Sequence, residues 1–140
     1  MIPPEKLAGN DTEDGHQMAV IQWAALNMHQ YPQLRWLHSI PNGAAFGNDK
    51  RTGAIRAAKM KATGMKPGVF DLFLPHANCG YHGLYIEMKR PKTANQTAGK
   101  VSDNQKDFYE YAMTNGYYPV YCYSWIEAVD ILTKYMDGEL

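Results

Sequence analysis

Asp71, Glu87 and Lys89 are the residues of this chain whose types and spacing best suit chemistry. Glu87 and Lys89 stand two residues apart, so in an extended strand their side chains point to the same face. Carboxylates are the hard oxygen ligands that Mg²⁺ and Mn²⁺ take, and a lysine beside them could activate a water molecule or stabilise phosphate charge. The three residues predict a metal-assisted hydrolytic site, provided that the fold brings Asp71 to Glu87.

The segments around these residues have the pattern of two strands, Gly68 to Leu74 and Gly83 to Lys89, joined by a loop that contains Cys79. Antiparallel pairing about Cys79 places Asp71 directly opposite Glu87, with β-carbons about 5 Å apart. Because side chains alternate, one face would carry Val69, Asp71, Phe73, Tyr85, Glu87 and Lys89, and the other Phe70, Leu72, Leu74, Leu84, Ile86 and Met88. The second face is wholly apolar and must be buried.

Two directly opposed carboxylates in a half-buried hairpin repel each other and destabilise the fold. A divalent cation held by both would remove the repulsion. An ion pair in which Lys89 bridges Asp71 and Glu87 would also remove it, without any chemistry. The pattern by itself leaves both interpretations open.

Helices and strands alternate along the rest of the chain. Capping, turn and periodicity signals predict helices from Thr12 to about Gln30, Thr52 to Thr63, Ser102 to Asn115 and Ser124 to Met136, and further strands from Leu34 to Ile40 and Tyr117 to Tyr123. Asp14 with Gln17, Ser102 with Gln105, and Ser124 with Glu127 have capping-box spacing. Pro119 restricts the last strand to an edge or a bulge. This order predicts an α/β fold with a central mixed sheet flanked by helices.

A chain of 140 residues can bury about two-thirds of its unfolded surface in one core. We therefore expect a single domain over residues 11–140 and a flexible tail over residues 1–10. Apolar residues at helical spacing are expected to face the core; these are Met18, Ile21, Ala25 and Met28, then Ile55, Ala58 and Ala62, then Phe108, Tyr111 and Ala112, then Trp125, Ala128, Val129, Leu132 and Met136.

Charge is unevenly distributed, although fourteen basic and fourteen acidic residues cancel over the whole chain. Between Gly47 and Lys106, eleven basic residues accompany four acidic ones, a local charge of +7 that the remainder offsets. Such a segment could line a phosphate backbone, although a solvated helix face has the same composition. The candidate DNA-binding residues are Lys50, Arg51, Arg56, Lys59, Lys61, Lys66, Arg90 and Lys92.

Other chemistries find little support in the sequence. Cys79 and Cys122 lie far apart and have the pattern of two reduced thiols. The five histidines form no HxxxH or HExxH pair and no glycine-rich phosphate-binding motif occurs, so neither a zinc enzyme nor a nucleotide cofactor is expected. No apolar run approaches the ~20 residues of a spanning helix and no signal sequence is evident, which predicts no membrane association and a cytoplasmic location.

The ordered motifs resemble a known nuclease family. Pro67 to Asp71 followed by Ile86 to Lys89 resembles the PD-(D/E)XK nuclease signature. The fuller string is similar to the VRR-NUC family of that superfamily over about residues 13 to 136; it consists of His38 to Gly43, Gly64 to Leu74, Gly83 to Arg90, Ser102 to Gln105, and the strand entry at Gly116 and Tyr117. The resemblance implies a restriction-endonuclease-like core in a stand-alone, single-domain protein.

The resemblance further implies metal-dependent hydrolysis of phosphodiester bonds. Asp71, Glu87 and the Met88 carbonyl would bind Mg²⁺ or Mn²⁺, Lys89 would be catalytic, and Gln105 would support the site. These roles come from the family and extend the metal site that the hairpin alone predicts.

The resemblance implies two further properties for this chain. The first helix of the family often adds a carboxylate to the site, for which Glu13 and, one turn on, the uncharged Gln17 are both candidates. Stand-alone members resemble junction-resolving nucleases that work as homodimers. The implied substrate is branched DNA, such as a four-way (Holliday) junction.

Two functions from different classes remain at this stage. One is a Mg²⁺-dependent, structure-selective DNA endonuclease. The other is a non-catalytic nucleic-acid-binding module of the same fold, in which Asp71, Glu87 and Lys89 form an ion-pair cluster. The intact triad favours the enzyme, and a flap or single-strand nicking nuclease is the alternative to a junction-resolving one.

Overall fold

A four-stranded mixed sheet forms the centre of the computed structural model, which describes residues 1–41 and 50–140. The strands lie in the order β1 (His38–Ser39), β2 (Leu72–Leu74), β3 (Leu84–Met88) and β4 (Tyr118–Cys122). The pairs β1–β2 and β2–β3 are antiparallel, and β3–β4 is parallel. The predicted mixed sheet is confirmed, and so is the position of β4, with its Pro119, at an edge.

The hairpin has the register expected from the sequence. Leu72 pairs with Ile86 and Phe73 with Tyr85, and the same register continued by one residue sets Asp71 opposite Glu87. The predicted apolar face is fully buried at Leu72, Leu74, Leu84, Ile86 and Met88.

Phe70 is the one member of that set which lies elsewhere. Its buried ring packs against Phe108, Tyr109 and Tyr121. Tyr121 is the register partner of Glu87, so Phe70 lies on the opposite face of the sheet. Strand alternation fails here because β2 begins only at Leu72.

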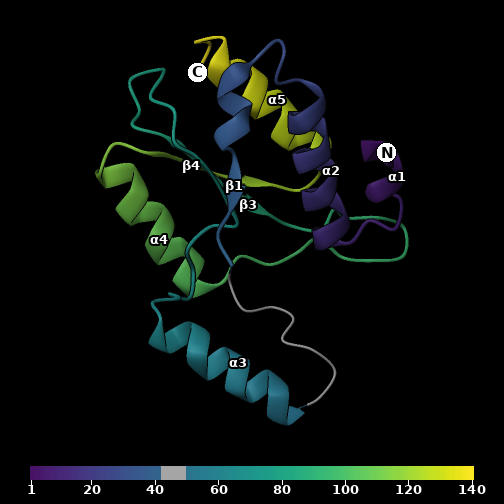
Figure 1. The fold of residues 1–140 in the computed structure, drawn as a ribbon, viewed down its shortest axis with the longest axis vertical. Coiled ribbons are helices and arrows are strands. Elements are labelled where there is room, and N and C mark those ends of the chain that lie inside the picture. Colours follow the sequence, from purple (N-terminus) through teal and green to yellow (C-terminus); the bar gives the residue numbers. More distant parts are fainter. Residues whose placement is uncertain (42–49) are drawn as a thin grey trace.

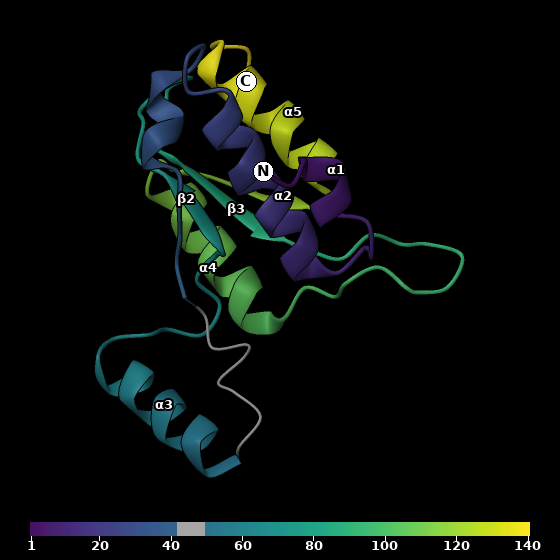
Figure 2. The ribbon, with the colours of Figure 1, turned by 45° about the vertical axis from the view of Figure 1, so that its right-hand side comes forward.

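Helices cover both faces of the sheet (Figures 1 and 2). On the apolar face lie α2 (Glu13–Leu26) and α5 (Trp125–Met136), which contribute Val20, Ala24, Ala128, Leu132 and Tyr135 to the core. On the other face lies α4 (Asp103–Thr114), whose Phe108 ring meets Tyr85 edge-on at 5.0 Å. The predicted α/β sandwich is confirmed, although Tyr111 of α4 is exposed rather than buried.

Helix α2 begins where the sequence predicts, ends at Leu26 rather than at about Gln30, and buries a different face. The Thr12 hydroxyl accepts a hydrogen bond from the Gly15 N–H at 3.0 Å, so Thr12 is the N-cap and no capping box forms at Asp14. The predicted core stripe is wrong, since Met18 and Ile21 are 51% and 38% exposed. The small residues of the neighbouring stripe, Val20 and Ala24, let α2 approach the sheet instead.

The first forty residues contain two further differences. Within the expected flexible tail, α1 (Pro4–Leu7) packs against α2, and Pro4 and Ala8 are buried. The first three residues of the strand expected from Leu34 to Ile40 belong instead to the 3₁₀ helix η1 (Pro32–Trp36), and the strand itself is limited to β1. Leu34 and Leu37, at the end of this helix, are both buried, because residues three apart lie on the same side of a 3₁₀ helix. In the predicted strand these two residues would have pointed to opposite faces.

Helix α3 (Lys50–Ala62) stands apart from the sheet and its covering helices (Figures 1 and 2). None of its residues is buried, and Ile55 of its expected apolar side is 60% exposed. The sequence Pro41-Asn42-Gly43 predicts a turn after β1, but Asn42 and Gly43 lie outside the described residues. None of the helices in the described part of the chain is long and apolar enough to span a membrane.

Candidate active site

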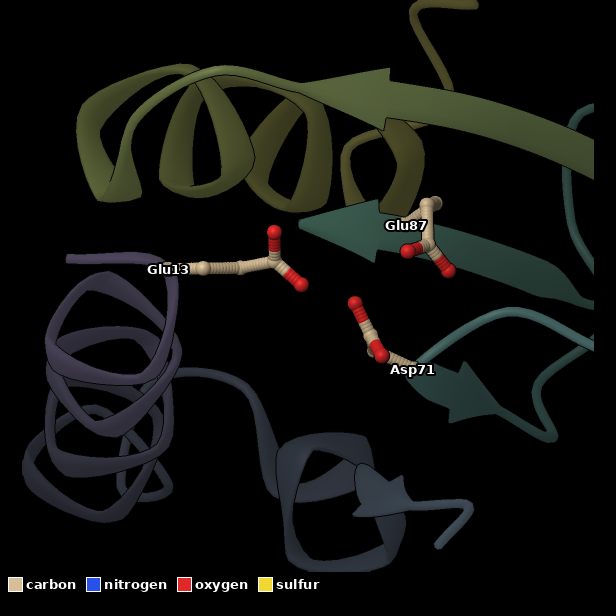
Figure 3. Close-up of side chains that lie close together, drawn as sticks. All are labelled: Glu13, Asp71 and Glu87. Carbon is tan, nitrogen blue, oxygen red and sulfur yellow. The ribbon is translucent and has the colours of Figure 1, made fainter. Parts of the chain in front are cut away.

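Three carboxylates from separate elements meet at one end of the sheet (Figure 3). Glu13 is the first residue of α2, Asp71 precedes β2, and Glu87 lies in β3. One oxygen of each lies within 4.8 Å of the others. The hairpin register brings Asp71 to Glu87, and the N-terminus of α2 adds Glu13.

Backbone hydrogen bonds fix Asp71 on both sides. The Met88 N–H donates to Asp71 Oδ2 at 2.9 Å, and the Ile40 N–H donates to the Asp71 carbonyl at 2.8 Å. Gly68 allows the preceding loop to take this course: its φ is +93°, and a β-carbon there would collide with the Asn104 carbonyl in α4. The loop therefore holds Asp71 close to the N-terminus of α4.

The side chain of Gln105 joins the remaining polar groups of the site. Lys89 Nζ donates to Gln105 Oε1 at 2.7 Å, and Gln105 Nε2 donates to Glu87 Oε2 at 3.0 Å. Lys89 Nζ also lies 3.8 Å from Glu87 Oε2. The same Oε1 accepts from the Ser102 N–H, which completes the predicted capping box of α4. The cap fixes the amide, and the amide fixes Glu87 and Lys89.

Burial raises the pKa values of all three acids, and the negative charge of Asp71 raises those of Glu87 and Glu13 further. Glu87 is 2% exposed, and burial, followed by the negative charge of Asp71, raises its pKa from 4.5 to about 9. Burial also raises the pKa of Asp71, against the lowering effect of the Met88 N–H bond. Burial and then Asp71 raise the pKa of Glu13. The cluster is therefore short of positive charge, despite the nearby Lys89 ammonium.

This donor set fits a divalent cation. Glu87 Oε1 is buried and has no hydrogen-bond partner among the described residues, whereas buried polar atoms are nearly always satisfied. A cation bound by the acidic triad would satisfy this oxygen and remove the repulsion that raises the pKa values. The triad can hold a metal ion, and its all-oxygen chemistry suits a hard one.

The two candidates on the first helix have different surroundings. Glu13 reaches the cluster, whereas Gln17 lines a hollow beside Ser39. Glu13 is the first residue of α2, and its carboxylate points toward those of Asp71 and Glu87 at the end of β3 (Figure 3).

The eight basic residues predicted to bind DNA are all exposed. Their positions are α3 for Lys50, Arg51, Arg56, Lys59 and Lys61, the α3–β2 connection for Lys66, and the segment after β3 for Arg90 and Lys92. Arg90 is held by Thr97, to whose carbonyl Nε donates at 2.9 Å. Two of these residues thus follow β3, and the others lie on α3 or just after it.

Sequence reasoning missed two residues that shape the site. Gly99 returns the 91–100 loop over Lys89, where a β-carbon would lie 3.3 Å from Lys89 Cβ and Cδ. Tyr121 lies beside Glu87 in the register, and its hydroxyl donates to the Gln105 carbonyl at 3.3 Å. A glycine in a polar loop does not by itself indicate a functional position, so Gly99 could not be recognised from the sequence. Tyr121 could not be recognised either, because its place beside Glu87 depends on the parallel pairing of β3 with β4.

Comparison with known proteins identifies the family. The model of the VRR-NUC domain matches residues 11–125. The chain belongs to the VRR-NUC family. A solved structure described as a VRR_NUC domain protein has a TM-score of 0.67 and 27% identity, over 91% of this chain and 89% of that one. No curated protein matches the chain. The predicted membership of this nuclease family and its restriction-endonuclease-like α/β fold are confirmed.

Proposed function

We propose that this VRR-NUC protein is a Mg²⁺- or Mn²⁺-dependent DNA endonuclease that cuts branched DNA, such as four-way (Holliday) junctions. The observation that carries the proposal is the acidic triad of Glu13, Asp71 and Glu87, with Lys89 held beside it by Gln105. A non-catalytic binding module has no need of three repelling carboxylates at one point.

Asp71, Glu87 and the Met88 carbonyl are the proposed metal ligands, together with Glu13. In a strand, the N–H and C=O of one residue point to the same side. The Met88 N–H donates to Asp71 Oδ2, so its carbonyl is directed toward the edge where Asp71 lies. A cation bound there supplies Lewis-acid stabilisation of charge on the phosphodiester.

Lys89 is the proposed catalytic cation of the protein itself. Its side chain is 7% exposed, and its ammonium points at Gln105 and Glu87 rather than at solvent. A fixed positive charge in a desolvated site stabilises negative charge that develops on phosphate oxygens far better than an exposed one. Gln105 positions Lys89 through the hydrogen bond to Oε1.

The basic residues of α3 and of the segment after β3 are the proposed DNA contacts. A helix of 13 residues is about 20 Å long, and α3 carries its positive charge away from the core, where a phosphate backbone can approach it. Lys66 lies in the connection from α3 to Asp71, and Arg90 and Lys92 follow Lys89 in the sequence. Duplex arms flanking a branch could then extend along α3 from the site of cleavage.

A homodimer would supply the two cuts that resolve a junction. Two-fold symmetry of the substrate matches an isologous dimer. The candidate interface residues are Trp23 of α2 and the aromatic segment from Tyr117 to Trp125. Pro119 lacks an N–H and the Tyr123 N–H donates to Glu127 Oε2 at 2.6 Å, which favours side-chain contacts over continuation of the sheet across β4.

The test is a panel of labelled duplex, flap and four-way-junction DNAs, incubated with the protein in Mg²⁺ and in EDTA. We expect the junction to be cut faster than the duplex, in Mg²⁺ only. Cleavage of flap DNA on one strand only would replace the resolving function with that of a nicking nuclease. Binding without cleavage of any substrate would support the non-catalytic module.

A further inference from the structure

The connection from β3 to α4 is a polar loop that hydrogen bonds fix at several points. It extends past α1 and the start of α2 (Figures 1 and 2). Gln96 Nε2 donates to the Asp11 carbonyl at 3.0 Å and to the Pro91 carbonyl at 2.8 Å. The Gly99 N–H donates to the Arg90 carbonyl at 3.0 Å. The 91–100 loop is therefore attached both to the chain that leads into α2 and across its own base.

Thr97, in this loop, orients the guanidinium of Arg90. Arg90 Nε donates to the Thr97 carbonyl at 2.9 Å, and Nη2 donates to the Thr97 hydroxyl at 3.2 Å. Two bonds from one edge of a planar group to one residue fix the plane of that group. An arginine held in this way has given up rotamer freedom before any ligand binds, which lowers the entropic cost of binding one.

The second edge of the Arg90 guanidinium is available to an anion. This edge is formed by Nη1 and the remaining proton of Nη2. Among the described residues, Nη1 has no hydrogen-bond partner and Arg90 forms no ion pair. Two parallel N–H groups of an arginine match two oxygens of a phosphate. The chemistry of this edge therefore suits a phosphate group.

Arg90 is close enough to the acidic triad to act on its charge. Burial raises the pKa of Glu13, and the positive charges of Lys89 and Arg90 oppose that rise. The chain is still extended at Lys89, whose N–H donates to the Cys122 carbonyl at 2.8 Å, and neighbouring side chains of an extended chain point to opposite faces. Lys89 points at Gln105 in α4. Arg90 therefore lies toward the α2 side, where Glu13 is found.

Charge balance at the triad leaves a role for a second cationic side chain. With a divalent cation bound, the three carboxylates are ionised. Together with the cation and the Lys89 ammonium they carry no net charge, so they provide no net attraction for a phosphodiester anion. Arg90 adds the positive charge that would balance the phosphate.

We propose that Thr97 is a positioning residue, which holds Arg90 so that the second edge of its guanidinium binds a DNA phosphate at the acidic triad. The proposal rests on the proposed function and adds a phosphate-binding group to its site. Gln96 and Gly99 fix the loop that carries Thr97. Thr97 itself does not contact the DNA in this arrangement, so its replacement should act only through Arg90.

The test is a methylphosphonate scan, in which one phosphate at a time is replaced by its uncharged methyl analogue. Four-way junctions carry the replacement at successive phosphates of one strand around the branch. Fluorescence anisotropy in EDTA measures binding without cleavage. We expect one phosphate at which the parent loses affinity about tenfold and Arg90→Ala loses nothing, because that variant already lacks the charge-assisted pair. At the other phosphates the two proteins should respond alike.

Variants of Thr97 test the positioning role. Thr97→Val removes the hydroxyl acceptor and should reduce the loss at that phosphate to about threefold. Thr97→Ser restores the hydroxyl and should behave as the parent. Added to Arg90→Ala, Thr97→Val should have no further effect, because the two residues act as one unit. A merely structural role for Thr97 would instead weaken binding equally in both backgrounds and would overturn its assignment.

Thr114→Val is the matched control, because the Thr114 hydroxyl also bonds within its own segment, to the Glu110 carbonyl at 2.8 Å in α4. It should keep the full tenfold loss. Arg90 and Thr97 are exposed, so the variants should fold, which melting curves check. Arg90→Lys is a second variant that keeps the charge without the planar fork, and it should show a reduced loss.

The outcomes separate this proposal from the proposed function. If Arg90→Ala keeps the parent's loss at every phosphate, the proposal is wrong. It is also wrong if the Arg90-dependent phosphate lies far from the bond that the parent cuts in Mn²⁺. An Arg90-dependent phosphate in a protein that cuts no DNA would refute the nuclease and leave the phosphate site standing. Cleavage without such a phosphate would do the reverse.

Discussion

Gln105 Nε2 donates a hydrogen bond to Glu87 Oε2 at 3.0 Å, while Gln105 Oε1 accepts one from Lys89 Nζ at 2.7 Å. The same oxygen accepts from the Ser102 N–H at the start of α4. One amide therefore connects a helix cap to both polar groups of the Glu87–Lys89 pair. Its orientation is determined, since Lys89 can only donate and the Glu87 oxygen accepts.

Gln105→Ala should lower the DNA cleavage rate by about 10- to 100-fold, the usual effect of losing a group that orients a metal-site ligand. Binding of DNA in EDTA should change little. Ser102→Ala is the matched control, because it removes the cap hydroxyl at a cost of about 1 kcal/mol in stability but keeps both Gln105 contacts. If both variants lost activity in proportion to their melting temperatures, Gln105 would have only a helix-capping role.

Millimolar Mn²⁺ should raise the melting temperature of the protein, because the cation relieves repulsion within the triad. Mass action gives about 2.7 kcal/mol at a hundredfold excess over the dissociation constant. Asp71→Asn should abolish the shift, because an amide is a much weaker ligand for the cation than a carboxylate. Glu110→Gln on the exposed side of α4 should keep the full shift. A parent melting temperature that Mn²⁺ leaves unchanged would refute the metal site.

Stability without metal should fall as pH rises. Because the pKa of Glu87 is raised from 4.5 to about 9, the folded protein keeps a proton that the unfolded chain releases. That stabilisation is complete below about pH 4.5 and is lost as pH approaches about 9. Melting in EDTA should show the parent falling relative to Glu87→Gln over this range. The Mn²⁺ shift should grow with pH, since the cation binds the deprotonated carboxylate. Parallel pH profiles of parent and variant would contradict the raised pKa.

The sequence was most informative where local pattern and tertiary burial agree. The strict alternation from Leu72 to Leu74 and from Leu84 to Met88 determined the register, and the register determined the meeting of Asp71 and Glu87. The spacing of Ser102 and Gln105 likewise determined the start of α4, because a capping box uses only neighbouring backbone groups.

Elements whose packing depends on distant segments could not be predicted in this way. Helix α2 has two apolar stripes, one with Met18 and Ile21 and one with Val20 and Ala24. The second is buried because its smaller side chains let the helix lie closer to the sheet. Ser124 caps α5 as expected, but Glu127 bonds the Tyr123 N–H. The sequence also could not show which of Glu13 and Gln17 lies near Asp71 and Glu87, because that depends on how the start of α2 packs beside the sheet.

Lys89 and the basic residues of α3 should affect different steps. Lys89→Ala should lower cleavage by about 10² or more, with little change in DNA affinity. Replacing Arg56, Lys59 and Lys61 with alanine should weaken binding and flatten its salt dependence by up to about 0.9 log units per lost phosphate contact. Anisotropy titrations over a range of salt concentrations, with single-turnover cleavage, measure both. An unchanged salt slope in the triple variant would remove α3 from the DNA interface.

The protein should be a dimer at micromolar concentration and should introduce paired, symmetric nicks into a four-way junction. Light scattering gives the mass, and strand-specific labels on the junction locate the two cuts. A monomeric mass together with nicking of one strand would exclude junction resolution and leave a flap or single-strand nuclease.

The central claim is that Glu13, Asp71 and Glu87 form a metal-dependent site for phosphodiester hydrolysis. The most direct measurement is the single-turnover rate of cleavage of a labelled four-way junction as Mn²⁺ is titrated, for the parent and for Asp71→Asn. The account predicts that the parent rate saturates with Mn²⁺ and vanishes in EDTA, and that Asp71→Asn stays at least about 10² slower at every Mn²⁺ concentration. Equal rates for parent and variant, or cleavage that persists in EDTA, would contradict it.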